Sequence, residues 1–249
     1  MSDRMTKVAA LAAVTMLATS AAHAQWTGKG AAGISLSSGN TDTKTGNAAV
    51  EFADTVGSWK HVFGFDGLYA AADSATTAQR WDLYEQSDFN ITPRNFVFGA
   101  ARYEEDRFSG FQYQATVSTG LGRHFVATDS TKLTAAIGIG YKNFETRNVY
   151  DESGALIEPH GTDNQAIARG TLDFEQKLTS TTTLLNKFLV EAGSANTYFQ
   201  NDLGLEVKMN TRLSLAVGYS VRHNTEPPMG FKKTDTLSTL NLVYEIKRP

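Results

Sequence analysis

The sequence predicts an all-β chain that closes into an antiparallel, up-and-down transmembrane β-barrel of about twelve strands. Three observations lead to this prediction. The N-terminal segment has the pattern of an export signal, and the segments after it alternate apolar and polar side chains. The connections between those segments also alternate between short and long. Because successive side chains of a strand point to opposite faces, such a chain builds a sheet with one apolar wall.

The first element is the export signal. A positively charged start precedes a short apolar run at 8–18, and an Ala-His-Ala sequence that ends at Ala24 fits a cleavage site of small residues. The run is too short and wrongly flanked for a membrane-spanning helix. We therefore expect cleavage after Ala24, with 1–24 as the signal peptide and 25–249 as a single outer-membrane barrel domain.

Composition sets further limits on the class of protein. The formal net charge is −3 and no basic stripe is present, so we expect no nucleic-acid partner. The absence of cysteine excludes disulfides and thiolate metal sites. Mean hydropathy is −0.29, which looks like a soluble protein. A spanning barrel escapes this test, because the residues that face its lumen lower the average.

Twelve candidate strands follow in order, each long enough for the roughly 9–11 residues that a tilted strand needs to cross a bilayer. They are predicted at 26–36, 43–56, 58–71, 79–91, 95–106, 111–125, 131–144, 164–178, 182–192, 197–208, 211–223 and 236–247. The connections after every second strand are short. Three of the others are longer, at 72–78, 145–163 and 224–235. With both chain ends in the periplasm, the short turns are periplasmic and the long loops external.

The two faces of the predicted barrel differ in chemistry. In the segment at 131–142, Leu133 and Ile137 lie on one face and Thr134 and Lys142 on the other. The face of small, polar and charged residues is expected to line the lumen. The charged lumen residues are expected to be Glu51, Asp66, Arg102, Glu104, Arg169, Asp173, Glu175, Lys187, Glu191 and Glu206. They could line a polar path or pair across the lumen and close it, since a barrel of about twelve strands is narrow.

Aromatic residues near the segment ends predict a girdle at the membrane interfaces. They are Trp26, Trp59, Phe63, Trp81, Phe89, Phe96, Tyr113, Phe125 and Tyr244. Two charged residues fall in the outward register, which is mostly apolar. Glu85 shares it with Leu83, and we expect a bulge to turn this carboxylate inward. Arg123 shares it near a periplasmic end, where its side chain can reach the interface.

Three stretches of the sequence resemble a known family. They are Ser-Gly-Asn-Thr-Asp-Thr at 38–43, Arg-Tyr-Glu-Glu-Asp-Arg-Phe-Ser-Gly-Phe at 102–111 and Gly-Leu-Gly at 120–122. Together they resemble the salt-induced outer-membrane proteins, the YdiY-like family, which is named as a domain of unknown function. The resemblance covers essentially the whole mature chain. It implies an outer-membrane barrel of Gram-negative bacteria and brings no catalytic residue or ligand.

Few residues suggest chemistry. No phosphate loop, zinc-helix motif or nucleophile elbow is present, so we expect no cofactor, no metal site and no enzyme activity. His61 faces outward, where a lipase would need it, but the sequence offers no serine or acid as its partner. Asp42 lies at a loop tip and could bind a cation or form a turn. Asp106 and Arg107 could form a gate, contact lipopolysaccharide or a cation, or form a salt-bridged loop that fixes a hairpin.

The sequence therefore predicts an outer-membrane barrel of uncharacterised role, either a narrow pore for ions or small solutes or a structural, salt-stress protein of the envelope. Its expected partners are outer-membrane lipid, lipopolysaccharide and, during biogenesis, the barrel-assembly machinery. Two alternatives stay open. A lipid-acting enzyme would place His61 or His124 within hydrogen-bond reach of a serine. A soluble periplasmic barrel would place its large apolar residues inside and its charges outside.

Overall fold

Twelve antiparallel strands form one closed barrel. The computed structural model describes residues 25–38, 43–72, 75–107, 109–151 and 153–247, so the predicted signal peptide lies outside the described residues. The strands of the first half are β1 (Gln25–Ser38), β2 (Thr43–Val56), β3 (Trp59–Ala72), β4 (Ala75–Asn90), β5 (Asn95–Asp106), β6 (Phe111–Ala127) and β7 (Thr131–Thr146). The second half has β10 (Thr162–Lys177), β11 (Thr182–Gly193), β12 (Thr197–Lys208), β13 (Leu213–Asn224) and β14 (Thr234–Lys247).

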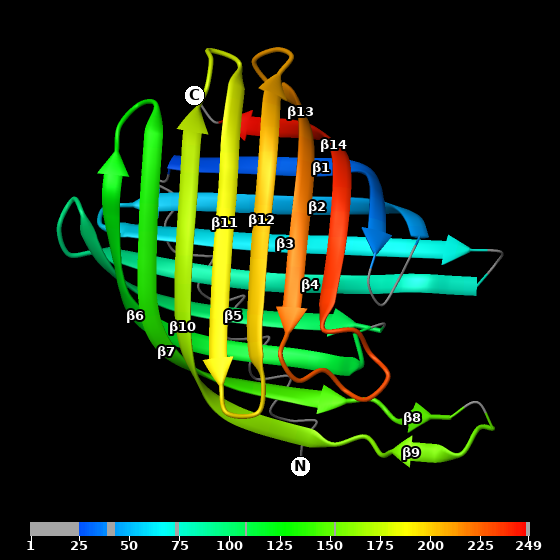
Figure 1. Cartoon of the computed structure of the whole chain (residues 1–249). Coiled ribbons are helices and arrows are strands. Elements are labelled where there is room, and N and C mark those ends of the chain that lie inside the picture. Colours follow the sequence, from blue (N-terminus) through cyan, green and yellow to red (C-terminus); the bar gives the residue numbers. More distant parts are fainter. Residues whose placement is uncertain (1–24, 39–42, 73–74, 108, 152, 248–249) are drawn as a thin grey trace.

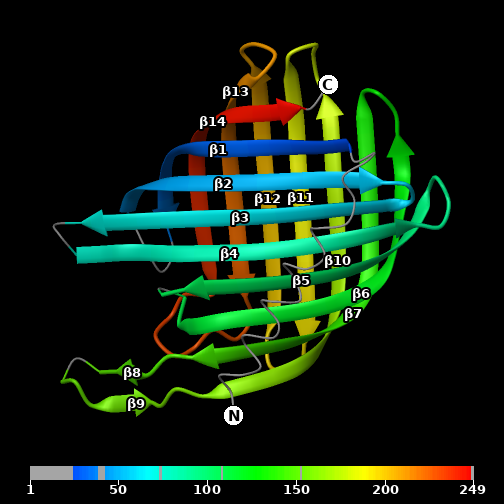
Figure 2. The ribbon, with the colours of Figure 1, turned by 180° about the vertical axis from the view of Figure 1, so that it is seen from behind.

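Each strand pairs with its neighbour in sequence, and β1 pairs with β14 to close the barrel. The strands of the two walls cross at a steep angle in Figures 1 and 2, as expected for strands tilted about the barrel axis. Among the described residues, no helix is long and apolar enough to span a membrane. The prediction of a barrel of about twelve strands is confirmed.

The two ends of the barrel differ. The turns after β2, β4, β6, β10 and β12 are short and lie at the end where β14 finishes, which we call the turn end (Figure 1). At the opposite end, the loop end, a hairpin of β8 (Val149–Tyr150) and β9 (Leu156–Glu158) stands between β7 and β10. This hairpin was not predicted. The long connection predicted at 72–78 was wrong, because β3 continues to Ala72 and β4 begins at Ala75.

Outer and inner walls carry different side chains. On β7, the side chains of Ile137 and Ile139 are 73% and 72% exposed on the outside, whereas the inward Lys142 is 3% exposed. Glu85 stays on the outer face, because the β3–β4 register is continuous around it and shifts only between Ala70 and Ala71. The inward bulge predicted for Glu85 was therefore wrong.

Glycines on the inner wall make room for aromatic rings. A Cβ added at Gly122 would lie 2.0 Å from the ring of Phe96, and one added at Gly120 would lie 2.8 Å from Phe98. Both rings are buried inside the barrel and pack with Ala136. Phe96 was predicted in the outer aromatic girdle, and this was wrong. Its position in the chain, next to a turn, did not reveal that its register faces inward.

Residues that stand opposite each other on successive strands form hydrogen-bonded rows around the barrel. These rows climb from the turn end to the loop end. The row that starts at Trp59, the first residue of β3 at the turn end, reaches Phe199 near the loop end of β12. Its members between these are Phe89, Val97, Leu121, Ile137, Gly170 and Val190. Neighbouring residues of one row therefore lie at successively greater heights along the barrel axis.

Candidate functional site: the lumen and the outer wall

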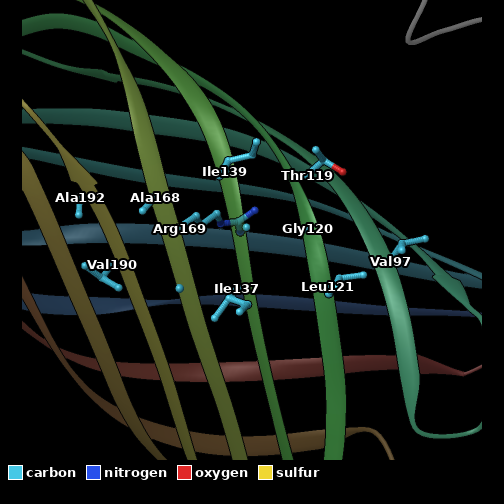
Figure 3. A pocket seen from close by; sticks show the side chains of 12 residues that line it. Val97, Thr119, Gly120, Leu121, Ile137, Ile139, Ala168, Arg169, Val190 and Ala192 are labelled. Atoms are coloured by element: carbon cyan, nitrogen blue, oxygen red, sulfur yellow. The ribbon is translucent and has the colours of Figure 1, made fainter.

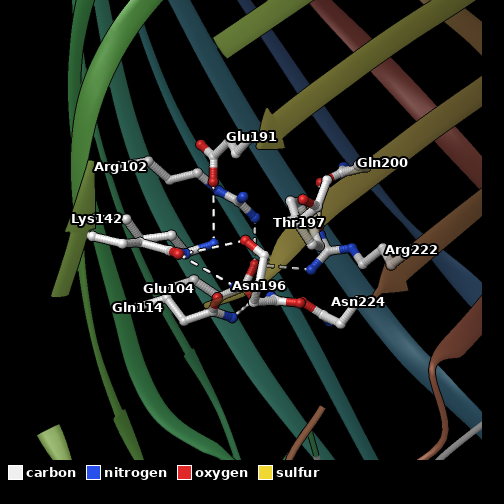
Figure 4. A network of polar contacts seen from close by, with 12 residues as sticks. Arg102, Glu104, Gln114, Lys142, Glu191, Asn196, Thr197, Gln200, Arg222 and Asn224 are labelled. Carbon is white, nitrogen blue, oxygen red and sulfur yellow. Dashed lines mark hydrogen bonds and ion pairs between the residues drawn. The ribbon is translucent and has the colours of Figure 1, made fainter. Parts of the chain in front are cut away.

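An ion-pair network crosses the lumen in its loop-end half. Arg222 of β13 donates from Nη1 to Oε2 of Glu104 on β5, at 2.9 Å. These two strands lie six positions apart in a ring of twelve, so they face each other across the barrel. Side chains from opposite walls thus meet in the middle. Figure 4 shows the meeting point, which lies inside the ribbon of the barrel.

This central cluster contains two guanidinium groups and two carboxylates. Arg102 also donates to Glu104, and Asp82 lies 3.9 Å from Arg102 Nε and 3.8 Å from Arg222 Nη2. Gln114 Nε2 donates to the other oxygen of Glu104 at 3.4 Å. The side chains of Arg222 and Glu104 are only 13% and 6% exposed. The four charges therefore balance one another in a site that excludes most solvent.

A second buried ion pair lies beside this central cluster. Lys142 Nζ donates to Glu191 Oε2 at 3.1 Å, and both side chains are almost completely buried. The ammonium group also lies 5.0 Å from the centre of the Tyr198 ring, within cation–π distance. Arg102 lies over the same ring at 5.7 Å. Tyr198 thus joins the two ion-pair groups into one network.

Loops cover the network at the loop end. Asn196, in the turn between β11 and β12, donates to Asn224 and accepts the backbone N–H of Glu226 at 3.0 Å. These bonds fix the start of the β13–β14 loop against the rim. Further along that loop, Pro228 and Phe231 lie so close to Gly110 that a Cβ there would meet them at 2.8 and 2.7 Å.

The lumen is more open toward the turn end. Lys187 Nζ of β11 reaches Glu51 of β2 at 3.3 Å, and Lys29 reaches Glu206 at 2.5 Å. These pairs also bridge separate parts of the wall. The lysine of the first pair is 61% exposed, in contrast to the closed central cluster. We call this half of the lumen the vestibule.

The remaining predicted lumen residues occupy the inner wall as well. Arg169 donates to Ser118 at 2.8 Å and to Gln86 at 3.4 Å. Glu175 pairs with Lys132 at 3.2 Å in the vestibule. Asp66 stands opposite Asp82, and Asp173 stands opposite Lys187. Among the predicted loop residues, Arg107 donates to Gln79 at 2.8 Å, Asp106 ends β5, and Asp42 lies outside the described residues.

Sequence reasoning missed several members of the network as site residues. They are Asp82, Gln114, Lys142, Tyr198 and Arg222. The alternating pattern already placed Lys142 on the inner face, and that signal could have found it. In the part of the chain that the structure describes, no group of three or more His, Asp or Glu side chains could hold a metal ion.

The outer wall carries a polar cluster near the turn end. His61 Nδ1 lies 2.6 Å from Ser87 Oγ, and the serine hydroxyl donates to Glu85. The imidazole lies 3.9 Å from the same carboxylate and stacks on Trp59. The expectation that His61 lacks a serine or acid partner was wrong. His124 instead contacts Thr134 Oγ1 at 2.8 Å, inside the barrel.

A shallow groove of about 800 Å³ follows the outer wall from β5 to β11 (Figure 3). Small residues form its floor, among them Thr119, Ala168, Gly170 and Ala192, and Leu121 and the two isoleucines of β7 rise beside them. A wall of this kind offers room for a flexible apolar chain. Its outward-facing lining residues belong to two hydrogen-bonded rows that are neighbours on the outer face.

A closed antiparallel barrel with an apolar outer wall and a charged interior defines the class of outer-membrane-type β-barrels. The chain belongs to the family described as protein of unknown function DUF481, whose model matches residues 30–246. It is 25% identical over 223 residues to the uncharacterised protein YdiY of Escherichia coli K12, covering 86% of this chain and 81% of that one.

Solved barrels share the fold. The translocator domain of the autotransporter NalP from Neisseria meningitidis matches with a TM-score of 0.54 at 13% identity, over 98% of this chain and 95% of that chain. The NanC porin matches with a TM-score of 0.54 at 10% identity, over 89% of this chain and 100% of that chain. At these identities the likeness establishes the fold alone.

Proposed function

We propose that the protein spans the outer membrane of a Gram-negative bacterium, with the turn end in the periplasm and the loop end outside. The apolar outer wall, the sorting of short turns from long loops and the likeness to outer-membrane barrels support this placement. Removal of the signal peptide after Ala24 belongs to the same proposal. Lipid and lipopolysaccharide would then surround the barrel, and the barrel-assembly machinery would insert it.

Within that membrane, we propose a barrel that is closed at rest and has a structural role in the envelope, with at most a narrow path for small ions. One observation carries this proposal: the 2.9 Å ion pair between Arg222 and Glu104, which joins opposite walls of the lumen. A general diffusion pore needs a water-filled channel. Here buried side chains and a folded loop occupy the loop-end half.

Conductance in a planar bilayer tests this function. The wild-type protein should be silent or show only small steps, while Arg222→Ala combined with Glu104→Ala should give larger discrete steps. Removing both partners avoids leaving one uncompensated charge. The matched control removes the exposed vestibule pair, Lys132→Ala with Glu175→Ala, and should leave the conductance unchanged.

Two results contradict the proposal. Wild-type steps as large as those of the central double variant would mean that the network does not close the lumen. A mature protein that stays soluble and folded without detergent would contradict the membrane placement. A gel that compares heated and unheated samples reports folding in every variant, so that an unfolded protein is not mistaken for a closed one.

We infer further that the protein is not an enzyme, although His61 and Ser87 are in contact. Glu85 accepts the serine hydroxyl, instead of holding the second ring nitrogen of the histidine as the acid of a Ser-His-Asp triad does. We expect no release of fatty acid from phospholipid vesicles that contain the protein. Release that disappears in Ser87→Ala would establish the lipid-acting alternative instead.

The inner wall also argues against a soluble carrier of apolar ligands. Its loop-end half holds buried ion pairs, whereas the large apolar side chains of β7 point outward. A carrier would reverse this arrangement, because apolar ligands need an apolar cavity.

A further inference from the structure

The outer-wall cluster of His61, Ser87 and Glu85 is polar in a region that faces lipid in the proposed membrane placement. Its side chains are only partly buried, and the hydroxyl connects the imidazole and the carboxylate. A carboxylate that faces hydrocarbon is costly unless it finds a polar partner. The cluster therefore has a reason to bind a polar group from the surrounding lipid.

The depth of the cluster matches the polar part of a lipid. Trp59 and Phe89 stand opposite each other next to the turn end, and their ring centroids lie 5.0 Å apart. His61 and Ser87 form the next outward-facing pair toward the membrane centre. Aromatic side chains mark the level of the headgroups in membrane barrels. The cluster thus lies just inside that level, where the polar and apolar parts of a lipid meet.

The groove on the outer wall continues from this cluster. The row of Ser87 runs through Gly99 and Thr119 to Ile139, then to Ala168 and Ala192. The last four of these line the groove, and its remaining outward-facing lining residues belong to the adjacent row that starts at Trp59. Between Ser87 and Thr119, a Cβ added at Gly99 would meet nothing within 4 Å. The path from the polar cluster into the groove is therefore open.

The direction of the groove suits an acyl chain. Because the hydrogen-bonded rows climb from the turn end to the loop end, the groove rises diagonally from the cluster toward the membrane centre. An acyl chain that starts at the headgroup level has to follow the same direction. The small side chains of the groove form the floor on which the acyl chain can lie, and Ile137 and Ile139 pack beside it.

Charge selects the headgroup. Asp54 stands opposite His61 on β2, and its Oδ1 is buried without a hydrogen-bond partner among the described residues. With Glu85, two carboxylates flank one imidazole. The described outward side chains of β2–β4 include no lysine or arginine, and the outward Arg123 of β6 is hydrogen-bonded to Asn95 of β5 at 3.2 Å. The surroundings of these two carboxylates therefore complement a cation that can donate hydrogen bonds.

From these observations we propose that the outer wall binds one glycerophospholipid with a primary ammonium headgroup. Glu85 and Asp54 receive the ammonium group, and one acyl chain lies in the groove from Gly99 to Ala192. The inference rests on the proposed membrane placement. It assigns a ligand to the outer wall and is independent of the closure of the lumen.

The experiment measures retained lipid by native mass spectrometry of the full mature protein released from nanodiscs. The probes are phosphatidylethanolamine, phosphatidylcholine and phosphatidylglycerol in equal amounts. Ala168→Trp fills the groove, and Glu85→Gln removes one carboxylate. The controls are Ala48→Trp, an exposed outward alanine of β2, and Glu105→Gln, which lies near the loop end of β5.

We expect the wild-type protein to retain phosphatidylethanolamine preferentially, because choline has no N–H to donate and phosphatidylglycerol is anionic. Glu85→Gln should reduce the preference about ten-fold, the size of a lost charge-assisted hydrogen bond. Ala168→Trp should reduce retention of all three lipids, and both controls should match the wild type.

Three results would overturn the inference: equal retention of the three lipids, no retained lipid, or equal effects of Ala168→Trp and Ala48→Trp. A protein that fails to enter nanodiscs would instead refute the membrane placement. The two failures are therefore distinguishable in the same preparation.

Discussion

Neutralising Glu104 should destabilise the barrel far more than neutralising a carboxylate of the vestibule. Glu104 accepts hydrogen bonds from Arg102, Arg222 and Gln114. In Glu104→Gln, the two buried guanidinium groups keep Asp82 as their one carboxylate partner among the described residues. Asp82 lies 3.9 Å from Arg102 Nε and 3.8 Å from Arg222 Nη2. Breaking a buried pair costs about 3–5 kcal/mol, and the remaining carboxylate places the expected loss near the lower end, at about 3 kcal/mol.

The matched control is Glu175→Gln. Its partner Lys132 is 58% exposed and Glu175 itself is 33% exposed. Solvent screens such a pair, so its loss should cost about 0–1 kcal/mol. The free energy of unfolding can be measured by urea titration of the protein in lipid vesicles, with tryptophan fluorescence as the signal. Equal losses in the two variants would refute the reasoning, because they would mean that water reaches the central cluster as freely as the vestibule.

Three further predictions concern other parts of the barrel. Gly122→Ala should cost about 1–3 kcal/mol in the same titration, because its Cβ would overlap the ring of Phe96; a loss that persists in Phe96→Ala would contradict this cause. Asn196→Ala should release the start of the β13–β14 loop and speed its cleavage by protease added outside vesicles. The pKa of Asp151 is lowered, chiefly because its carboxylate accepts the Ser153 hydroxyl. The order of the β8–β9 turn should therefore be complete above the ordinary pKa of 3.8 and fall below it, as hydrogen exchange would show.

Local patterns explain why the barrel could be predicted from sequence. Period-two alternation over 131–142 is a property of one strand and needs no knowledge of its neighbours. It gave the strand positions, the outward isoleucines and the inward Lys142. The same pattern placed the charged residues of the lumen on one face.

Contacts between distant segments could not be predicted in this way. Glu104 and Arg222 are 118 residues apart, and their contact depends on how many strands close the ring. The pairing of His61 with Ser87 depends on the β3–β4 register, which the predicted loop at 72–78 had obscured. Glu85 shows this most clearly. The sequence revealed no partner for its carboxylate, so a bulge that turns it inward was predicted, and the structure does not contain that bulge.

The charge balance of the central cluster has an electrical consequence. Arg102 and Arg222 carry two positive charges, and Asp82 and Glu104 carry two negative charges. Separation of Arg222 from Glu104 moves opposite charges apart across the barrel, in the plane of the membrane. Electrical work depends on net charge moved along the membrane normal, about 2.3 kcal/mol per charge and 100 mV. Opening of this barrel should therefore have a gating charge near zero and be indifferent to the transmembrane voltage.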